Sequence, residues 1–570
     1  MNKKYILGLL ITITLIGAFL RIFPVRYGSV RMYDNQLVSQ ALDLGEGIAK
    51  GDFSVFKTPV KYPYFFSYIL LFFYGLFYVF GKLIGLFSSV GEFINYIYFH
   101  IDGFYDFARI LIGIFGTLLI PLVYLVTFKI VSFKNKEKAG IAGLLAAFLM
   151  AFNLLHVHIS HQERPHILVG FFIFLSFYLF ILFLEKRSLI YSLFLGLSIG
   201  LAAGSLQVGL LALFFFFLIV IFTKFKTLLS FKFWLAILLF LMIFVISYPY
   251  IILSFKNVVG LWDNTFHVNI SESEGLRKNL YFGQEIKQIF VYQPELICLF
   301  IIFLIFWLFL RHKTIESSPS LYRMSLWGAG SFILVYFLAF GFLVMPYHRM
   351  LASLIPFLCL LVGILFYEVF YKFNKKLFKE IFIIILVLFL LFPVIQDIRF
   401  CYLIFKKETV ELARDWIKDN VSKEDVVAIE YDNIRLTPDK KSLQLQSNLE
   451  PGSLSRKENF LLSLDENLYP KDNRKILNYW IFQYKENRYQ FLKEQKVKYF
   501  VISKSNPKEI SRNGLESEII SKGGKLVKVF NPFVGETSSR HALFPAEFED
   551  PIVDLWIFER LGQVIEIYKL

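Results

Sequence analysis

Residues 3–36 read KKYILGLLITITLIGAFLRIFPVRYGSVRMYDNQ, and this stretch decides the fold. Two lysines precede the apolar run from Tyr5 to Phe19, and several arginines and one carboxylate, Asp34, follow it. Such a run is typical of a helix that crosses a hydrocarbon core about 30 Å thick. Because no small-x-small cleavage site follows, we expect a retained span rather than a removed signal peptide. Asp34 therefore stands at the first exit from the membrane, one of the few places for aqueous chemistry in such a chain.

The composition predicts a polytopic helical membrane protein. The chain has 570 residues, is 56% hydrophobic, and repeats long apolar runs up to about Pro393. The net charge is +15, but the basic residues cluster at the ends of the apolar runs. We therefore expect them to set the topology and to contact anionic membrane lipids, and we do not expect nucleic acid as a partner. The cysteines show neither a disulfide framework nor a zinc-ligand spacing; they are Cys298, Cys359 and Cys401.

Clusters of lysine and arginine between the apolar runs predict the topology. Lys3 and Lys4 place the N-terminus in the cytoplasm, and five later basic clusters are assigned to the same side. This gives about eleven crossings and a C-terminus outside the cell. We expect a multi-pass protein of the inner or plasma membrane. The predicted crossings are residues 5–23, 109–131, 139–157, 167–184, 189–205, 208–223, 233–252, 295–310, 325–344, 350–371 and 379–397.

One apolar run, Tyr62 to Phe80, breaks the alternation. Counted as a crossing, it would put the next basic cluster on the wrong side. We therefore predict that residues 31–108 form one outside loop containing a re-entrant or interfacial helix, which suits the many Tyr and Phe residues of the run. The alternative, in which residues 62–80 and 93–108 both cross, keeps the same parity.

The composition becomes mixed and charged beyond Phe405. We expect residues 1–405 to form the transmembrane domain and residues 406–570 a soluble α/β domain outside the cell. Residues 408–420 have helical spacing of apolar positions. Runs of β-branched and aromatic residues predict strands at 426–429, 498–502, 526–530, 553–558 and 564–568.

The first outside loop carries a series of short motifs in a fixed order. Asp34-Asn35-Gln36 is followed by Gln40-Ala41-Leu42, Gly51-Asp52, Lys57-Thr58-Pro59 and Tyr62-Pro63. Ala108-Arg109, His348-Arg349 with Pro356, and Ala413 with Trp416 come later in the chain. Together these resemble the GT-C superfamily of polytopic glycosyltransferases, in the branch of the protein mannosyltransferases and the aminoarabinose transferases. The resemblance covers about residues 5–430. It departs at Asn35, where the family has a glutamate, so Asp34 lacks the neighbouring acid.

The resemblance implies a GT-C-like fold and an inverting glycosyltransferase. Such an enzyme moves a sugar from a polyprenyl-phosphate donor to an acceptor, a lipid, glycan or protein, at the outer membrane face. Asp34 would act as the general base or as a metal ligand. The sequence identifies neither the sugar nor the acceptor. It lacks a Trp-Trp-Asp motif in the C-terminal region, which disfavours oligosaccharyltransferase catalysis.

Glu163, in the next outside segment, is the second candidate carboxylate. Asp34 and Glu163 together offer the hard oxygen ligands that suit Mg²⁺ or Mn²⁺. One carboxylate could instead act as a base without a metal. The alternative without a catalytic role is a salt bridge from Glu163 to Arg164 or Arg109.

The candidates for binding the donor phosphate are Arg109, His348 and Arg349. Arginine offers a bidentate fork to phosphate, and these residues lie at outer ends of the predicted spans. Snorkelling arginine at a span end is the plainer explanation. The second loop is rich in histidine, which we interpret as hydrogen-bond donors near a lipid phosphate rather than as a zinc site, because no cysteine lies nearby. Further candidates are His161, Arg164, His166 and Lys57.

Two other classes of function stay open at this point. A lipid or small-molecule transporter, such as a flippase, would carry charged or Gly- and Pro-broken spans near the bilayer midplane, whereas the predicted spans are almost uncharged. A non-catalytic GT-C-like assembly subunit is the other alternative, and the missing acid at Asn35 is consistent with it.

Overall fold

In a computed structural model, the described residues of the chain fall into two compact units. They are residues 3–23, 36–57, 60, 62–223, 225–254, 287, 289–310, 319–343, 348–371, 376–430, 434–478, 487–507, 515–535 and 550–570. One unit holds the helices up to Ile398, except α4 (Val90–Phe99) and the start of α5 (Ile101–Ser132). The other holds α4, Asp102, and the chain from Arg399 onward.

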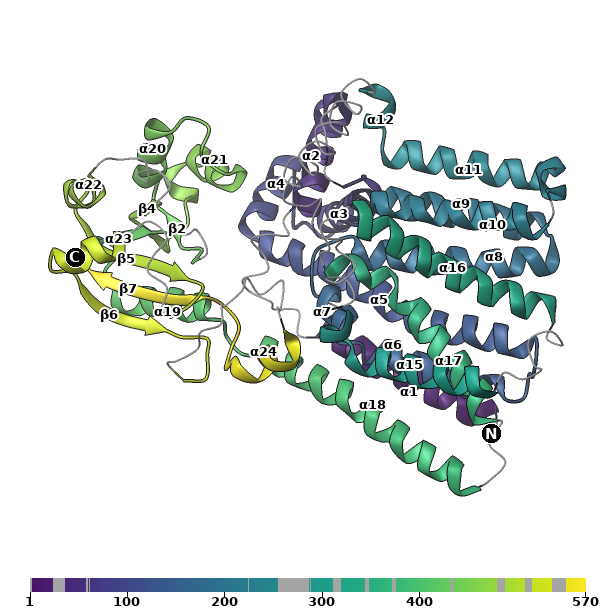
Figure 1. The fold of residues 1–570 in the computed structure, drawn as a ribbon. Helices are drawn as coiled ribbons and strands as arrows, with labels where there is room; N and C mark the ends of the chain where they lie inside the picture. The colour runs from purple at the N-terminus through teal and green to yellow at the C-terminus, as the bar shows by residue number, and fades with distance from the viewer. Residues whose placement is uncertain are drawn as a thin grey trace. The chain divides into compact units, whose positions relative to one another are not determined.

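The first unit is a bundle of apolar helices (Figure 1). Among the described residues, six helices are long and apolar enough to cross a membrane, or seven if the bent pair α6 and α7 counts as one span. The chain is therefore a mostly helical membrane protein, as predicted. The helices not yet given bounds are α1 (Lys3–Ile22), α6 (Ala139–Ala151), α7 (Leu154–Ser160), α8 (His166–Lys186), α9 (Leu189–Ser205), α10 (Phe214–Phe222), α11 (Phe231–Ser247), α12 (Tyr250–Leu253), α15 (Pro294–Leu310), α16 (Ser320–Leu343), α17 (Ile355–Phe370) and α18 (Lys376–Phe405).

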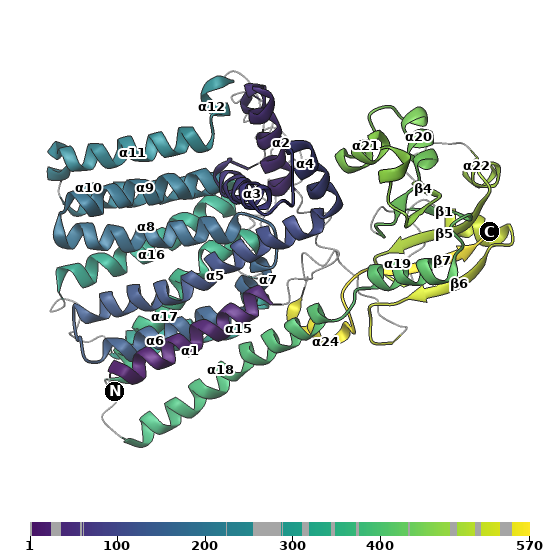
Figure 2. The same ribbon diagram turned by 180° about the vertical axis from the view of Figure 1, so that it is seen from behind.

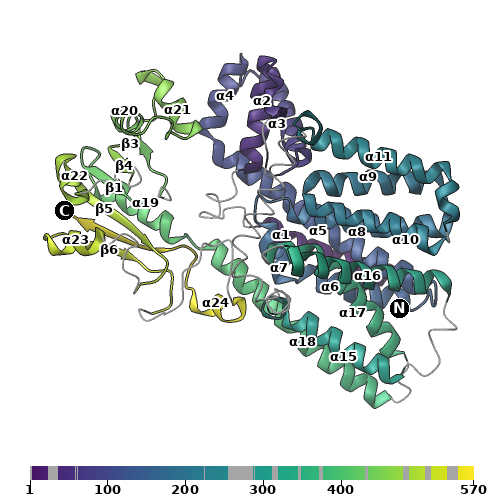
Figure 3. The ribbon, with the colours of Figure 1, turned by 45° about the horizontal axis from the view of Figure 1, so that its top comes forward.

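Helices α9 and α11 run side by side in all three views (Figures 1, 2 and 3). Helix α9 carries Gly196, Gly200 and Gly204 at every fourth position, which places them on one face. A Cβ atom on Gly196 would lie 2.1 Å from the carbonyl oxygen of Ala236 on α11. Small residues at this spacing let two helix backbones approach closely in a membrane. The α9–α11 contact therefore depends on these glycines.

The first loop is folded against the bundle. It contains α2 (Gln36–Lys50), the 3₁₀ turn η2 (Phe53–Lys57) and α3 (Phe65–Leu83). The backbone N–H of Tyr64 donates to the carbonyl of Ser247 at 2.6 Å, and the Tyr68 hydroxyl donates to the carbonyl of Ile246 at 2.8 Å. The start of α3 is thus joined to the end of α11. Helix α3 is one of the six long apolar helices, and residues 93–108 are divided between α4 and α5, with a break at His100.

The second unit contains a five-stranded mixed sheet in the order β4-β1-β5-β7-β6. Strand β1 (Val426–Ile429) is parallel to β4 (Ile476–Asn478) and β5 (Val497–Lys504), and β7 (Val564–Lys569) is antiparallel to β5 and to β6 (Lys525–Phe530). The strands predicted at 426–429, 498–502, 526–530 and 564–568 are present. The remaining elements are α19 (Thr409–Asn420), β2 (Thr437–Pro438), α20 (Lys440–Leu449), α21 (Arg456–Ser463), β3 (Asn473–Arg474), α22 (Arg488–Glu494), α23 (Leu515–Ser521) and α24 (Pro551–Ile557).

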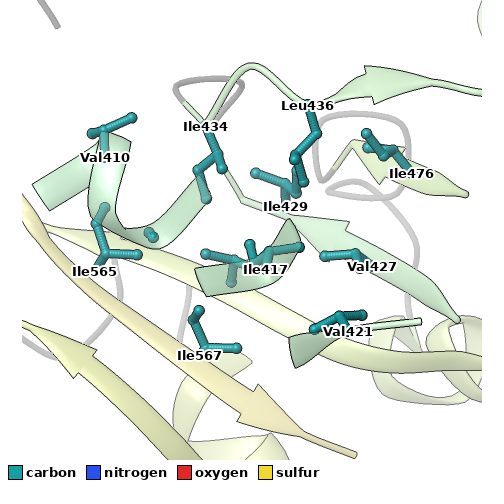
Figure 4. Close-up of a cluster of buried hydrophobic side chains, with 12 residues drawn as sticks. Val410, Ile417, Val421, Val427, Ile429, Ile434, Leu436, Ile476, Ile565 and Ile567 are labelled. Atoms are coloured by element: carbon teal, nitrogen blue, oxygen red, sulfur yellow. The ribbon is translucent and has the colours of Figure 1, made fainter. Parts of the chain in front are cut away.

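Helices cover both faces of this sheet. Val410 and Ile417 of α19 pack on one face, against Val427, Ile429 and Ile567 (Figure 4). Helices α22 and α23 pack on the other face, where their buried side chains meet those of β1 and β5; this cluster includes Leu492, Ile519, Ala428, Phe500 and Ile502. The region predicted as α/β is therefore a mixed α/β fold with its own core.

The strand predicted at residues 553–558 is wrong, because Pro551–Ile557 is helix α24. Pro551 occupies the first helical position, where its fixed φ angle and missing N–H favour a helix start. The Asp554 carboxylate accepts the backbone N–H of Asp550 at 2.8 Å and so closes the first turn. A run of β-branched and aromatic side chains was thus overridden by the chemistry of a helix N-terminus.

Candidate functional site

The segment from Asn153 to His166 forms a buried polar region inside the helical unit, and we call residues 153–166 the polar segment. Asn153 caps α7 by accepting the backbone N–H of His156 at 3.0 Å, and the chain bends by 55° between α6 and α7. Nine-tenths or more of each polar side chain in this group is buried: Asn153, His156, His158, Ser160, His161, Gln162, Glu163 and His166. Such a density of buried polar groups needs partners, and these come from several helices.

Arg21, in the last turn of α1, is the main cationic partner of the polar segment. Its side chain is 1% exposed. Its guanidinium donates to the carbonyl oxygens of Met150 at 2.6 Å and Ala151 at 2.8 Å, at the end of α6. Its Nε donates to Nδ1 of His156 at 3.3 Å. A cation at this position satisfies helix carbonyls that have no intrahelical partner and interacts favourably with the helix dipole.

His161 joins the polar segment to the same end of α1. Its Nε2 lies 2.8 Å from the carbonyl oxygen of Leu20, so Nε2 carries the proton and donates it. Burial lowers the pKa of His161 to about 4, and the charges of Arg109 and Arg21 act in the same direction. The ring is therefore a neutral donor at physiological pH.

Glu163 binds the helix that follows the first span. Its Oε1 accepts the backbone N–H of Val38 at 2.7 Å, and its side chain is 1% exposed. Val38 is the third residue of α2, so this N–H belongs to the first turn, whose donors have no intrahelical acceptor. A carboxylate here also complements the positive end of the helix dipole. The hydrogen bond connects the polar segment to α2.

His348 approaches the polar segment from another part of the chain. It begins the 3₁₀ turn η7 (His348–Ser353) and stacks on Tyr292 with ring centroids 4.9 Å apart. The ring of His158 lies parallel to it at 6.4 Å. Asn153 and Gln293, next to Tyr292 in sequence, exchange amide hydrogen bonds with each other. The structure thus brings His348 and the polar segment together.

The other predicted residues lie in different settings. Arg109 is 4% exposed and pairs with Asp106 at 3.2 Å, and its charge reaches His161. Arg349 follows His348 in η7 and is half-buried, as is Arg164. His166 is buried at the first position of α8. Lys57 is the exposed last residue of η2.

Asp34 and Asn35 lie outside the described residues, so their predicted roles stay predictions. The described part of the chain contains no group of three or more His, Cys, Asp or Glu side chains that could hold a metal ion.

Several buried charged residues were not singled out from the sequence. Among them are Arg21, Glu295 at the start of α15, and Asp397 in α18, exposed by 1%, 4% and 0%. The charges of Arg21 and Glu295 act on Asp397, and neither Asp397 oxygen accepts a hydrogen bond from any residue that the structure describes. The signal in the sequence was available: each is an ionisable residue within or at the end of an apolar helix, which is costly without a purpose.

No protein-family model and no curated protein sequence matches this chain. Several solved structures do. A crystal structure of the oligosaccharyltransferase of Archaeoglobus fulgidus, tethered to an acceptor peptide, is 15% identical over 88% of this chain and 69% of that chain, with a TM-score of 0.42. The same enzyme in complex with Zn and sulfate is 15% identical over 86% of this chain and 67% of that chain, with a TM-score of 0.44. ArnT of Cupriavidus metallidurans, bound to undecaprenyl phosphate, is 10% identical over 99% of this chain and 98% of that chain, with a TM-score of 0.46.

The chain is thus structurally similar to GT-C membrane glycosyltransferases, as the sequence motifs predicted. The zinc, peptide and lipid are ligands of the matched proteins.

Proposed function

We propose that this chain is a glycosyltransferase of the outer face of the plasma membrane, which moves a sugar from a polyprenyl-phosphate donor to an acceptor. The observation that carries the proposal is the hydrogen bond that Glu163 accepts from the Val38 N–H of α2. This bond joins a buried carboxylate to the helix that begins two residues after Asp34 in the sequence. It supports a site assembled from the first two outside segments.

Asp34 acts as the general base in this proposal. It takes the proton of an acceptor hydroxyl while the hydroxyl oxygen attacks the anomeric carbon from the face opposite the phosphate. The new C–O bond forms as the bond to the phosphate oxygen breaks, and its electron pair leaves with the polyprenyl phosphate. The configuration is inverted. Because phosphate is already a good leaving group, no strong general acid is needed.

Arg109, His348 and Arg349 bind the donor phosphate in this proposal, and His161, Arg164, His166 and Lys57 are further candidates. A cation that stabilises developing charge on a leaving phosphate is often the largest single contribution to catalysis. Arg109 is supported by its burial and by the reach of its charge to His161. His348 is supported by its stacking on Tyr292 beside His158.

A divalent cation, Mg²⁺ or Mn²⁺, would have to be held by Asp34 and Glu163 with water and donor phosphate. One Glu163 oxygen already accepts the Val38 N–H, and no third ligand side chain joins it among the described residues. The described residues therefore do not by themselves form a cation site. The transfer proposed for Asp34 uses no cation.

The topology in this proposal has about eleven crossings, a cytoplasmic N-terminus, an outside loop at 31–108 with α3 at the interface, and an extracytoplasmic domain at 406–570. The half-buried or exposed lysines Lys134, Lys136 and Lys138 between α5 and α6 support an inside position for that turn.

The test uses the purified full chain in lipid nanodiscs with polyprenyl-phosphate-linked sugars extracted from the host membrane. Mass spectrometry of the lipid fraction should show loss of one lipid-linked sugar and release of polyprenyl phosphate when the host acceptor fraction is added. A lipid-linked sugar pool that stays unconsumed with every acceptor fraction would overturn the proposed function.

A further inference from the structure

The polar segment contacts both helices that border residues 24–35. Helix α1 ends at Ile22, before these residues, and α2 begins at Gln36, after them. Asp34 belongs to the stretch between the two helices. Contacts that fix the last turn of α1 and the first turn of α2 therefore fix the described residues on either side of that stretch.

His161 makes the contact with α1. Its Nε2 donates to the Leu20 carbonyl at 2.8 Å, one of the last four carbonyls of the helix. These carbonyls have no intrahelical N–H and need an outside donor when buried. Arg21, the next residue, reinforces the contact by donating to His156 at 3.3 Å.

Glu163 makes the contact with α2. It accepts the Val38 N–H at 2.7 Å, one of the first four N–H groups of the helix. A carboxylate at a helix N-terminus stabilises the helix, and more strongly when it is partly buried than when it is exposed. The face of α2 that it helps to hold is fully buried, with Leu37, Val38 and Ala41 at 0% exposure.

We infer that His161 and Glu163 are positioning residues that anchor the two ends of the segment carrying Asp34. They are two positions apart in the sequence and hold helices whose contacted residues, Leu20 and Val38, lie on either side of Asp34. This assigns a structural purpose to the acid that could otherwise be read as a base or a metal ligand. The inference rests on the proposed function in one respect, that Asp34 is the catalytic carboxylate.

Glutamine separates the two roles of Glu163. Its amide oxygen can accept the Val38 N–H, but it can neither act as a base nor supply negative charge. Alanine removes the acceptor and leaves the buried Val38 N–H without this partner, which destabilises the first turn of α2. At position 161, glutamine keeps an N–H donor and alanine does not. Glu46→Ala serves as the control, because it removes a half-exposed carboxylate of the same helix that pairs with Lys50.

The experiment compares Glu163→Gln, Glu163→Ala, His161→Gln and His161→Ala in nanodiscs, with hydrogen exchange and transfer measured on the same samples. We expect Glu163→Ala to lose amide protection in the first turn of α2 and His161→Ala to lose it in the last turn of α1. Their kcat should fall about a hundredfold with little change in KM, since a misplaced catalytic group lowers the rate of the chemical step. The glutamine variants should keep the protection and stay within about tenfold of wild type.

Two outcomes would overturn the inference. One is a Glu163→Gln variant as inactive as Glu163→Ala while α2 stays protected, which would make Glu163 a base or ligand. The other is unchanged protection of α2 in Glu163→Ala. Because hydrogen exchange needs no substrate, an absence of transfer in the wild type would count against the proposed function and leave the anchoring to be decided by exchange.

Discussion

Arg21 shows how much one side chain fixes in this chain. It is buried, it ends α6 by donating to the Met150 and Ala151 carbonyls, and it fixes the ring of His156 as an acceptor at Nδ1. Nothing in the apolar pattern around it predicts these contacts, because His156 lies 135 residues away. The same is true of Glu163, whose partner Val38 is 125 residues away. The sequence pattern predicts neither of these long-range partners.

Replacing Arg21 with methionine tests this role. The change leaves the buried carbonyls of Met150 and Ala151 without this donor, so we expect the free energy of unfolding to fall by about 1–3 kcal/mol for each carbonyl. Thermal unfolding in detergent measures it. Lys82→Met, the same change at an exposed position of α3, should stay within about 0.5 kcal/mol of wild type. Equal effects of the two substitutions would contradict the role given to Arg21.

At the scale of elements, most helices of the bundle follow from the length of the apolar runs, whereas their contacts follow from small residues. The stripe of Gly196, Gly200 and Gly204 was present in the sequence but was not used to pair α9 with α11. In the second unit, the pattern of apolar residues predicted four of the strands. The fifth predicted strand is a helix, because Pro551 and Asp554 favour a helix start. Residues at the helix start, and not the periodicity of the segment, therefore determined the structure of Pro551–Ile557.

The α9–α11 contact can be tested with one methyl group. A Cβ at Gly196 would lie 2.1 Å from the Ala236 oxygen, a backbone atom that cannot rotate away. We expect Gly196→Ala to lower the stability of the bundle by about 1–3 kcal/mol through overpacking. Gly330→Ala on α16, where a Cβ meets nothing within 4 Å, is the matched control. A melting temperature unchanged by Gly196→Ala would show that the helices are not packed as described.

A buried ionic cluster ties β5 to β7 and α23. Lys504 contacts Glu516 at 2.6 Å and Glu566 at 2.7 Å, with only 4% of its side chain exposed. Burial opposes its charge, but hydrogen bonds to the two carboxylates outweigh this and raise the pKa of Lys504 above 10.5. Removing the cation would leave the two largely buried carboxylates without this counter-charge, although the Tyr568 hydroxyl would still donate to them.

We therefore expect Lys504→Met to destabilise the second unit by about 3–5 kcal/mol at neutral pH. Because the pKa is raised in the folded state, the stabilisation by Lys504 is fully present below about pH 10.5 and is lost as the pH rises through the folded value. The difference in melting temperature between wild type and variant should thus be constant near neutral pH and shrink above about pH 10.5. A difference that grows with pH would contradict this sign.

At the scale of the whole molecule, many of the buried polar side chains of the helical unit lie in one short stretch of the chain. The helical unit is largely apolar, yet one fourteen-residue stretch, residues 153–166, holds most of its buried histidines together with Glu163. A chain that served only to span the membrane would have no reason to carry the cost of burying these groups. This concentration, next to the helix that follows Asp34, is the basis for the proposed transfer chemistry.

The most direct measurement of that proposal is the rate of sugar transfer by Asp34→Asn in nanodiscs. Asparagine keeps the shape of the side chain but removes the base, so we expect the rate to fall by about 10²–10⁴. Asp52→Asn is the matched control, because Asp52 lies in the same loop, is exposed, and accepts the Ser54 N–H at 2.9 Å, as an asparagine can. Loss of transfer in Asp34→Asn with normal folding and normal transfer in Asp52→Asn is the predicted result. Near-normal transfer by Asp34→Asn would contradict the account.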